Sequence, residues 1–209
     1  EEKQFASNIF NEHQLDRSKK TVMISIIGSS TNKTYPLEYM SEVVDFVSTK
    51  MNANILFNYI PNQLELAQKV YDHCKEESKK NIFFNLLGKN LREFIIIMDS
   101  CDFIIGNDGG AINMAKALNK PSFIIFSPWI EKRMWSTFED GKLHDSVHLL
   151  DYMPNLIEGK TKKQLKDNSI ALYPNLKPSF FESKLSQFID YNLEKNNEII
   201  KPTNFDELY

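Results

Sequence analysis

The sequence predicts an α/β fold of Rossmann type, a mostly parallel sheet with helices on both faces. Six apolar, β-rich segments alternate with segments whose apolar residues recur at helical spacing. The strands expected at 103–105 and 123–126 are apolar without interruption, which is typical of strands buried on both faces of a parallel sheet. With 209 residues, 42% hydrophobic and 25% charged, the chain is long enough for one good core but not comfortably for two.

The expected elements alternate along the chain, and turn residues set their limits. The expected strands are residues 21–27, 54–60, 81–87, 103–105, 123–126 and 146–150. The expected helices lie within 1–20, from 36 through 47, and at 64–74, 91–101, 111–118 and 180–193. Gly28 ends the first strand, Pro36 can start the second helix, and Asn119 stops a helix before Pro121. The inward side of the helix at 64–74 is expected to carry Leu64, Ala67, Val70 and Tyr71.

Residues 91–101 admit two interpretations. The run Phe-Ile-Ile-Ile-Met is typical of a strand, whereas Leu91, Phe94, Ile95 and Met98 fall at helical spacing. We predict a helix, because it preserves the alternation of strand and helix. A strand here would leave only residues 99–102 before the next strand.

The ends of the chain are expected to differ from its centre. We divide it into a lead-in helix at 1–20, a Rossmann-like nucleotide-sugar-binding domain at 21–178, and a C-terminal helix and tail at 179–209. Residues 151–178 are polar, contain Pro154, Pro174 and Pro178, and are expected to be irregular. The tail from Glu194 is expected to be loose or to need a partner surface. Because the chain begins at Glu1, in an apparent helix, we expect a fragment or a processed product.

The composition excludes several classes of protein. A net charge of -3 argues against nucleic-acid binding, which depends on lysine and arginine. The two cysteines, Cys74 and Cys101, have neither metal-ligand nor redox spacing, so the sequence favours a reduced cytosolic compartment and predicts no metal. No apolar run approaches the roughly 20 residues that cross a bilayer.

Two loops carry the polar residues that can bind a ligand. The loop at 28–35 offers Ser29, Ser30, Asn32, Lys33 and Thr34, and the loop at 106–110 offers Asp108, Gly109 and Gly110. Loops at the carboxyl ends of neighbouring parallel strands converge, so these side chains can meet and hold a diphosphate at a helix N-terminus. Asp108 can accept from sugar hydroxyls or cap the following helix. Taken singly, the glycine turn can be a mere connection and Lys33 a solvated loop lysine. The dinucleotide fingerprint and the P-loop are both absent.

Four motifs in residues 21–151 carry a resemblance to a known family. Lys33-Thr34-Tyr35-Pro36 matches its Lys-x-aromatic-Pro sequence, and residues 108–113 stand where the family has Asp-Ser-Gly-x-x-His. Asn119-Lys120-Pro121 and Phe126-Ser127-Pro128 follow in the expected order. The chain therefore resembles the C-terminal half of the ADP-heptose:lipopolysaccharide heptosyltransferases, glycosyltransferase family 9, which have two Rossmann-like domains facing across a cleft (the GT-B type).

This resemblance implies the donor-binding half of an inverting, metal-independent glycosyltransferase of lipopolysaccharide or surface-glycan synthesis. The donor would be a nucleotide sugar, in the family an ADP-sugar, with no separate cofactor. The residues implied to bind it are Ser29, Ser30, Lys33, Thr34, Glu65, Asp108, Gly109, Gly110 and Asn113. The catalytic base and the glycolipid acceptor site belong to an N-terminal domain outside this chain, so the chain alone is expected to be inactive. The family works in the cytoplasm, and a peripheral position at the inner face of the inner membrane is compatible with it.

The chain also departs from the family pattern. Gly109 replaces a serine or threonine, Asn113 replaces a histidine, and Ser127 replaces a glycine. These departures and the missing half keep open the alternative of a non-catalytic nucleotide-sugar-binding module. Half of a sugar-nucleotide epimerase is a further alternative, because such enzymes share the two-domain fold.

Overall fold

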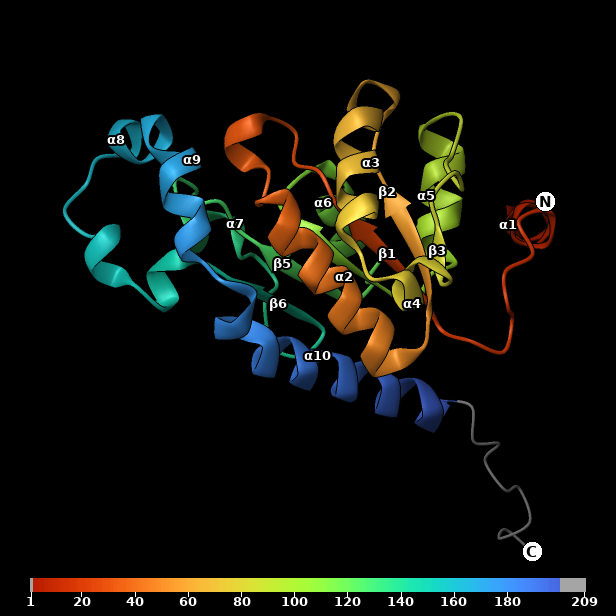
Figure 1. Ribbon diagram of the computed structural model, residues 1–209. Coiled ribbons are helices and arrows are strands. Elements are labelled where there is room, and N and C mark those ends of the chain that lie inside the picture. Colours follow the sequence, from red (N-terminus) through yellow and green to blue (C-terminus); the bar gives the residue numbers. More distant parts are fainter. Residues whose placement is uncertain (1, 200–209) are drawn as a thin grey trace, which may run out of the picture.

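A computed structural model describes residues 2–199 and confirms the α/β prediction. Its six strands form one sheet in the order β3-β2-β1-β4-β5-β6, and every neighbouring pair is parallel (Figure 1). The strands are β1 (Thr21–Ser25), β2 (Asn54–Asn58), β3 (Ile82–Phe83), β4 (Phe103–Asn107), β5 (Ser122–Ile125) and β6 (His144–Val147). This order reverses direction between β1 and β4, as in doubly wound nucleotide-binding folds.

Helices cover both faces of the sheet. They are α1 (Glu2–Glu12), α2 (Leu37–Met51), α3 (Leu64–His73), α4 (Glu76–Lys79), α5 (Leu91–Asp99), α6 (Gly110–Ala117), α7 (Lys132–Trp135), α8 (Lys162–Asp167), α9 (Ser169–Leu172) and α10 (Pro178–Ile199). Short 3-10 turns lie at η1 (Thr31–Lys33), η2 (Pro61–Gln63), η3 (Leu149–Asp151), η4 (Pro154–Leu156) and η5 (Tyr173–Asn175). The helix predicted for the ambiguous segment 91–101 is confirmed by α5. Among the described residues, none of the helices combines the length and apolar composition that a membrane crossing requires.

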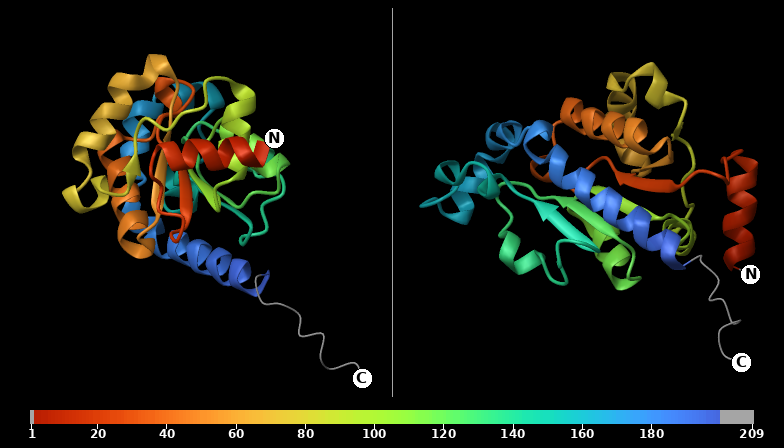
Figure 2. Two further views of the ribbon diagram at one scale, coloured as in Figure 1. Left: turned by 90° about the vertical axis from the view of Figure 1, so that its right-hand side faces the viewer. Right: turned by 90° about the horizontal axis from the view of Figure 1, so that it is seen from below.

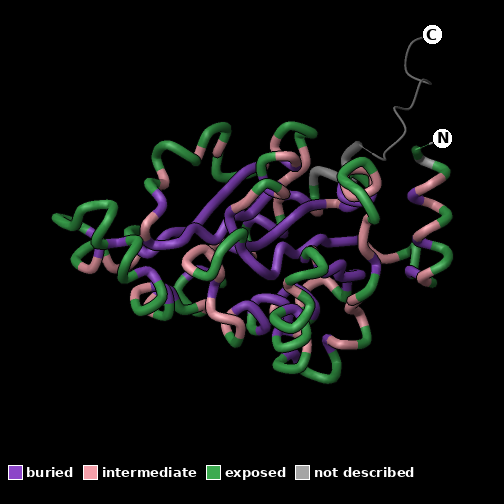
Figure 3. The backbone as a smooth tube through the Cα atoms, turned by 90° about the horizontal axis from the view of Figure 1, so that it is seen from above, coloured by how far each residue is buried: buried purple, intermediate pink, exposed green. Residues whose placement is uncertain are grey.

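Alternate residues of strands β1 to β5 pack into two separate cores. Val22 and Ile24 of β1 pack with α2 and α10, whereas Met23 between them packs with α5 and α6. Figure 2 shows α2 and α3 on one side of the strands and α5 on the other, and Figure 3 shows the strands as the buried centre of the molecule. Burial on both faces explains why these strands are continuous apolar runs.

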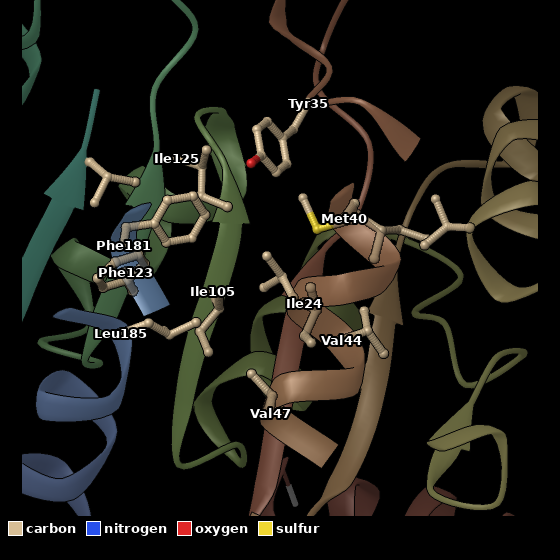
Figure 4. Packing of buried hydrophobic residues seen from close by; sticks show 14 of the residues in the cluster. Ile24, Tyr35, Met40, Val44, Val47, Ile105, Phe123, Ile125, Phe181 and Leu185 are labelled. Carbon is tan, nitrogen blue, oxygen red and sulfur yellow. The ribbon is translucent and has the colours of Figure 1, made fainter. Parts of the chain in front are cut away.

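The larger core lies between the sheet, α2 and α10. Figure 4 shows Met40 and Val44 of α2 pointing toward Ile24, and Phe181 of α10 beside Phe123. Every one of these side chains is at most 1% exposed. Because α10 belongs to this core, the C-terminal helix is packed against the sheet.

Several predictions about individual segments are wrong. Residues 151–178 are not irregular: they contain α8, α9 and two 3-10 turns, with Leu165, Tyr173 and Leu176 buried. A Thr161–Gln164 capping box starts α8, a local signal that the polar composition of the segment conceals. The expected strand at 81–87 is reduced to Ile82 and Phe83.

Two further differences concern helix limits and faces. Leu64, predicted to point inward, is 49% exposed, because it is the first residue of α3 and the buried face begins at Ala67. The tail predicted to be loose from Glu194 is helical as far as Ile199, because α10 continues to that residue. The rest of the predicted tail, residues 200–209, lies outside the described residues.

Candidate functional site

The candidate site lies at the carboxyl ends of β1 and β4, where the strand order reverses. In doubly wound sheets the loops at such a point diverge to opposite faces and leave a crevice in which ligands bind. The loop after β1 contains η1, and the loop after β4 leads through Asp108 and Gly109 into α6. Both candidate loops found in the sequence therefore border the crevice, as expected from their positions after neighbouring strands.

Lys33 and Asp108 join the two loops directly. Lys33 Nζ donates to Asp108 Oδ2 at 2.9 Å, although 75 positions separate the residues in sequence. The side chain of Lys33 is 20% exposed and that of Asp108 is 7% exposed. The structure thus brings the two residues together as an ion pair with little access to solvent, so Lys33 is not a freely solvated loop lysine.

Asn107, the last residue of β4, fixes the position of the loop after β1. Its Oδ1 accepts from the Tyr35 backbone N–H at 2.7 Å, and its Nδ2 donates to the Ser25 carbonyl at 3.0 Å. The side chain is fully buried. Because buried backbone groups need partners, this one amide sets the distance between the two strand ends.

Two glycines allow the backbones at this edge to approach closely. A Cβ on Gly28 would lie 2.4 Å from the Lys33 carbonyl oxygen, and one on Gly106 would lie 2.4 Å from the Ser25 carbonyl oxygen. Gly106 also has a φ of +132°, a conformation that side chains disfavour. Thr34 closes the same loop, since its Oγ1 accepts from the Gly28 N–H at 3.2 Å and donates to the Ser30 carbonyl at 2.9 Å.

The N-terminus of α6 has exposed backbone beside the ion pair. Gly109 is its N-cap residue and no side chain caps the helix, so the capping role considered for Asp108 is wrong. A Cβ on Gly109 would have no protein atom within 4 Å, and one on Gly110 would meet only the Met114 methyl at 4.0 Å. Asn113, one turn further along, is exposed. This end of the helix can present its first N–H groups to an anion.

A large apolar cavity adjoins this helix. Its volume is about 620 Å³, and it lies between the carboxyl end of β2, the loop before α5, and α6. Residues that line it include Asn58, Tyr59, Gly88, Asn90, Phe94 and Met114. Its size and lining are those of a pocket for a small organic molecule.

A second cavity of about 440 Å³ lies on the other side of the loop after β1. Gly28, Ser29, Ser30, Gln63 and Tyr173 contribute to its lining. Gln63 is a residue that the sequence did not point out: its Nε2 donates to the Gly28 carbonyl at 3.0 Å and its Oε1 accepts from the Ile60 N–H at 3.1 Å.

Ser29 and Ser30 are exposed at this edge, and Ser30 donates to the Asn32 side chain at 2.7 Å. Glu65, the acidic residue implied by the resemblance, is exposed and lines neither cavity. Its assignment to the nucleoside therefore rests on the resemblance alone.

Ser127 and Trp129 also support the site, although neither was among the predicted binding residues. Ser127 Oγ donates to the Asn32 carbonyl at 2.6 Å, and Trp129 Nε1 donates to the same oxygen at 3.0 Å. A polar residue directly after a buried strand was the available signal for Ser127. Together these bonds attach η1, and with it Lys33, to the loop after β5.

Burial shifts the pKa of several side chains in the molecule toward the uncharged form. Burial lowers the pKa of His148, whose Nδ1 accepts from the Leu150 N–H at 2.9 Å. Burial, and secondarily the charge of Asp108, raise the pKa of Tyr173, whose hydroxyl donates to the Ile125 carbonyl at 3.0 Å. Burial also raises the pKa of the Cys74 thiol to about 12, so this thiol is not a nucleophile near neutral pH. No cluster of three or more His, Cys, Asp or Glu side chains suited to a metal ion occurs in residues 2–199.

Comparison with known proteins places the chain in a family. A sequence profile described as glycosyltransferase family 9 (heptosyltransferase) matches residues 1–139. The chain belongs to glycosyltransferase family 9. It is similar to lipopolysaccharide heptosyltransferase 1 of Campylobacter coli, with 33% identity over 116 residues that cover 54% of this chain and 33% of the relative.

Two solved structures show the same fold. A glycosyltransferase family 9 protein from Veillonella parvula superposes with a TM-score of 0.68 at 18% identity, covering 90% of this chain and 50% of that one. The ADP-heptose lps heptosyltransferase II of E. coli superposes with a TM-score of 0.59 at 16% identity, covering 82% and 51%. The chain thus spans about half the length of these GT-B enzymes and a third of the curated relative.

Proposed function

We propose that this chain is the donor-binding half of an inverting, metal-independent glycosyltransferase that uses a nucleotide sugar. The observation that carries the proposal is the meeting of Lys33, Asp108 and the uncapped N-terminus of α6 at the switch point of the sheet. Lys33 and the first N–H groups of α6 provide donors for a diphosphate. Asp108, a poor neighbour for phosphate, can accept from the hydroxyls of the sugar.

The apolar cavity of about 620 Å³ is the proposed site of the nucleoside. It borders α6 directly, through Ala111 and Met114, so a base held there keeps its diphosphate near Gly109 and Gly110. Aromatic rings of Tyr59 and Phe94 line it, and such rings suit a flat purine. The E. coli relative is described as an ADP-heptose enzyme, which favours an ADP-sugar as donor.

In the proposed mechanism, a hydroxyl of the acceptor attacks the anomeric carbon of the sugar from the side opposite the nucleotide. The bond from that carbon to the diphosphate oxygen breaks, and the nucleoside diphosphate leaves with the electron pair. Lys33, the hydroxyls of Ser29 and Ser30, and the N–H groups at Gly110 stabilise the developing charge. The proton of the attacking hydroxyl passes to a base in the other half of the enzyme.

Calorimetry of this chain with ADP, adenosine and an ADP-sugar tests the proposal. We expect ADP to bind more tightly than adenosine, and Lys33→Gln to weaken ADP binding by about 1.5–3 kcal/mol, the range for a hydrogen bond to a charged group. Lys20→Gln is the matched control, because Lys20 forms an ion pair with Asp102 but at the opposite end of β1. Equal effects of the two variants on ADP binding would contradict the proposal.

A turnover assay locates the base. The chain alone should bind the donor without transferring sugar, because the acceptor site and the base are assigned to the other half. Transfer of sugar by this chain alone would show that the base has been misplaced.

A further inference from the structure

Three lysine ammonium groups gather around the ring of Trp129. The Nζ of Lys33 lies 5.6 Å from the ring centroid, that of Lys162 lies 5.8 Å from it, and that of Lys166 lies 5.2 Å from it. Only one of these cations belongs to the loop after β1; the other two come from α8, more than a hundred residues further along the chain. The ring attracts each cation weakly.

The two α8 lysines differ from Lys33 in lacking a carboxylate partner. Lys33 is neutralised by Asp108, but neither Lys162 nor Lys166 has a carboxylate oxygen within 4.0 Å among the described residues. They are separated by four positions, so they lie on the same side of the helix, where like charges repel. The cluster therefore has an excess of positive charge that the protein itself does not balance.

The cluster is nevertheless held in place by good local structure. Thr161 and Gln164 form a capping box at the start of α8, and Leu165 is buried beneath it. On the other side, Trp129 is half-buried and its Nε1 is hydrogen-bonded to Asn32 of η1. These contacts anchor α8 and the ring of Trp129 without any counter-charge for Lys162 and Lys166 in the described part of the chain.

We propose that Lys162 and Lys166, together with the ring of Trp129, form a second anion site that binds a dianionic phosphate group. The link of this site to a donor or acceptor rests on the proposed function, but the binding of phosphate by the lysines does not. The phosphate can come from two sources: the diphosphate of the donor nucleotide, or a phosphate carried by the acceptor. In either case α8 adds positive charge that is not paired with a carboxylate of the described residues, as that of Lys33 is with Asp108.

The test uses two double variants that remove equal charge from one segment. Lys162→Gln/Lys166→Gln removes the two cations at the ring, and Lys160→Gln/Lys163→Gln removes two neighbours that form no cation–π pair with it among the described residues. All four lysines are exposed, so folding should be retained. A Trp135→Phe background leaves Trp129 as the only tryptophan, so its fluorescence reports binding at the ring.

Each protein is titrated with inorganic phosphate at pH 8 and with ADP, at constant ionic strength. We expect the first double variant to bind phosphate at least about fivefold more weakly, while the second stays within about twofold of the parent. Lys162→Arg/Lys166→Arg should restore binding. If ADP displaces phosphate and binds the first double variant more weakly, the phosphate bound at α8 belongs to the donor. If phosphate still binds when ADP is already bound, the phosphate bound at α8 belongs to the acceptor.

Two results would overturn the inference. One is an equal loss of phosphate affinity in both double variants, which would show that only the net charge of the segment matters. The other is a phosphate titration of the parent protein that matches one with chloride. Phosphate binding without any binding of ADP or adenosine would leave this inference standing and would contradict the proposed function instead.

Discussion

Two ion pairs join the segments of β1 and β4, one at each end of the sheet. Lys20 and Asp102 precede the strands and meet at 3.1 Å, whereas Lys33 and Asp108 follow them and meet at 2.9 Å. Both carboxylate oxygens of Asp102 have a donor within the fold, because Oδ1 accepts from Lys20 and Oδ2 accepts from the Thr21 N–H at 2.8 Å. Asp108 has no hydrogen-bond donor other than Lys33 among the described residues.

The difference lies in what remains available to a ligand. The Asp102 side chain is 23% exposed yet fully engaged, whereas the Asp108 side chain is 7% exposed and keeps unused acceptor capacity. Beside Asp108, the Cβ positions of Gly109 and Gly110 have free space and a cavity of about 620 Å³ adjoins α6, whereas the cavity beside Asp102 is smaller, about 340 Å³. In doubly wound parallel sheets, ligands bind at the carboxyl ends of the strands, and this is the end at which Asp108 keeps its acceptor capacity.

The largest expected effect comes from crowding the carboxyl end. Gly106→Ala places a Cβ against the Ser25 carbonyl at a φ of +132°, so we expect unfolding to become easier by about 3–5 kcal/mol from strain and overpacking together. Gly159→Ala is the control, since Gly159 also has a positive φ of +75° but no atom near its Cβ position. Urea denaturation of both variants checks the difference, and similar losses would show that close packing at Gly106 is unimportant.

Asparagine substitutions at the two ends separate stability from binding. Asn107→Ala leaves the Tyr35 N–H and the Ser25 carbonyl without partners, and Asn54→Ala removes bonds to the Asp16 carbonyl and Thr21 Oγ1. Each should cost about 2–4 kcal/mol of stability, because buried polar groups lose partners. Only Asn107→Ala should also weaken ADP binding, by about tenfold or 1.4 kcal/mol. A similar loss of ADP affinity in Asn54→Ala would mean that the effect reflects general loosening.

The two histidines of the β6 segment extend the comparison to pH. His144 Nδ1 lies 2.9 Å from Ser122 Oγ, whereas Nε2 of His148 has no hydrogen-bond partner among the described residues. Burial lowers the pKa of both. Below about pH 6.5, the pKa of histidine in the unfolded chain, the unfolded state therefore binds more protons than the folded state. The contribution of the neutral histidines to the free energy of unfolding is fully present above that pH and is lost as the pH falls toward the lowered pKa of the folded state.

We expect stability to fall by about 1 kcal/mol per pH unit for each buried histidine below pH 6.5. His148→Asn retains an acceptor for the Leu150 N–H but cannot titrate, so the slope should be smaller in this variant. Thermal denaturation between pH 5 and 8 measures both slopes. An identical slope in the variant would show that His148 is not responsible.

Much of the fold was predictable because strands β1 to β5 contribute residues to both cores. Residues such as Val22 and Met23 are both apolar and pack on opposite faces, so continuous apolar runs indicated a covered parallel sheet. The convergence of the loops that carry Lys33 and Asp108 followed from the same reasoning, since neighbouring parallel strands end at one edge, but the ion pair between the two side chains was not predicted. These predictions needed only local pattern and the geometry of the sheet.

The remaining features depend on contacts that local pattern does not contain. Asn107 and Gln63 bond backbone groups of remote segments, and nothing in the surrounding residues specifies those partners. Residues 151–178 were misjudged because their average polarity conceals a few buried positions, among them Tyr173 and Leu176. Lys162 and Lys166 belong to a lysine-rich stretch of the sequence at 160–166, but their meeting with Trp129 depends on the three-dimensional fold.

The smallest expected effect tests the unused capacity of Asp108 itself. Asp108→Asn removes a negative charge beside the proposed diphosphate site and leaves Lys33 without a counter-charge, so ADP should bind about threefold more tightly, a gain of about 0.7 kcal/mol. If Asp108 accepts from sugar hydroxyls, an ADP-sugar should not share this gain, because an amide is the weaker acceptor. Asp102→Asn is the control, because Asp102 lies at the opposite end of the strands, and it should change neither affinity. Calorimetry with ADP and an ADP-sugar separates these outcomes, and an equal gain of affinity for both ligands would show that Asp108 does not accept from the hydroxyls of the sugar.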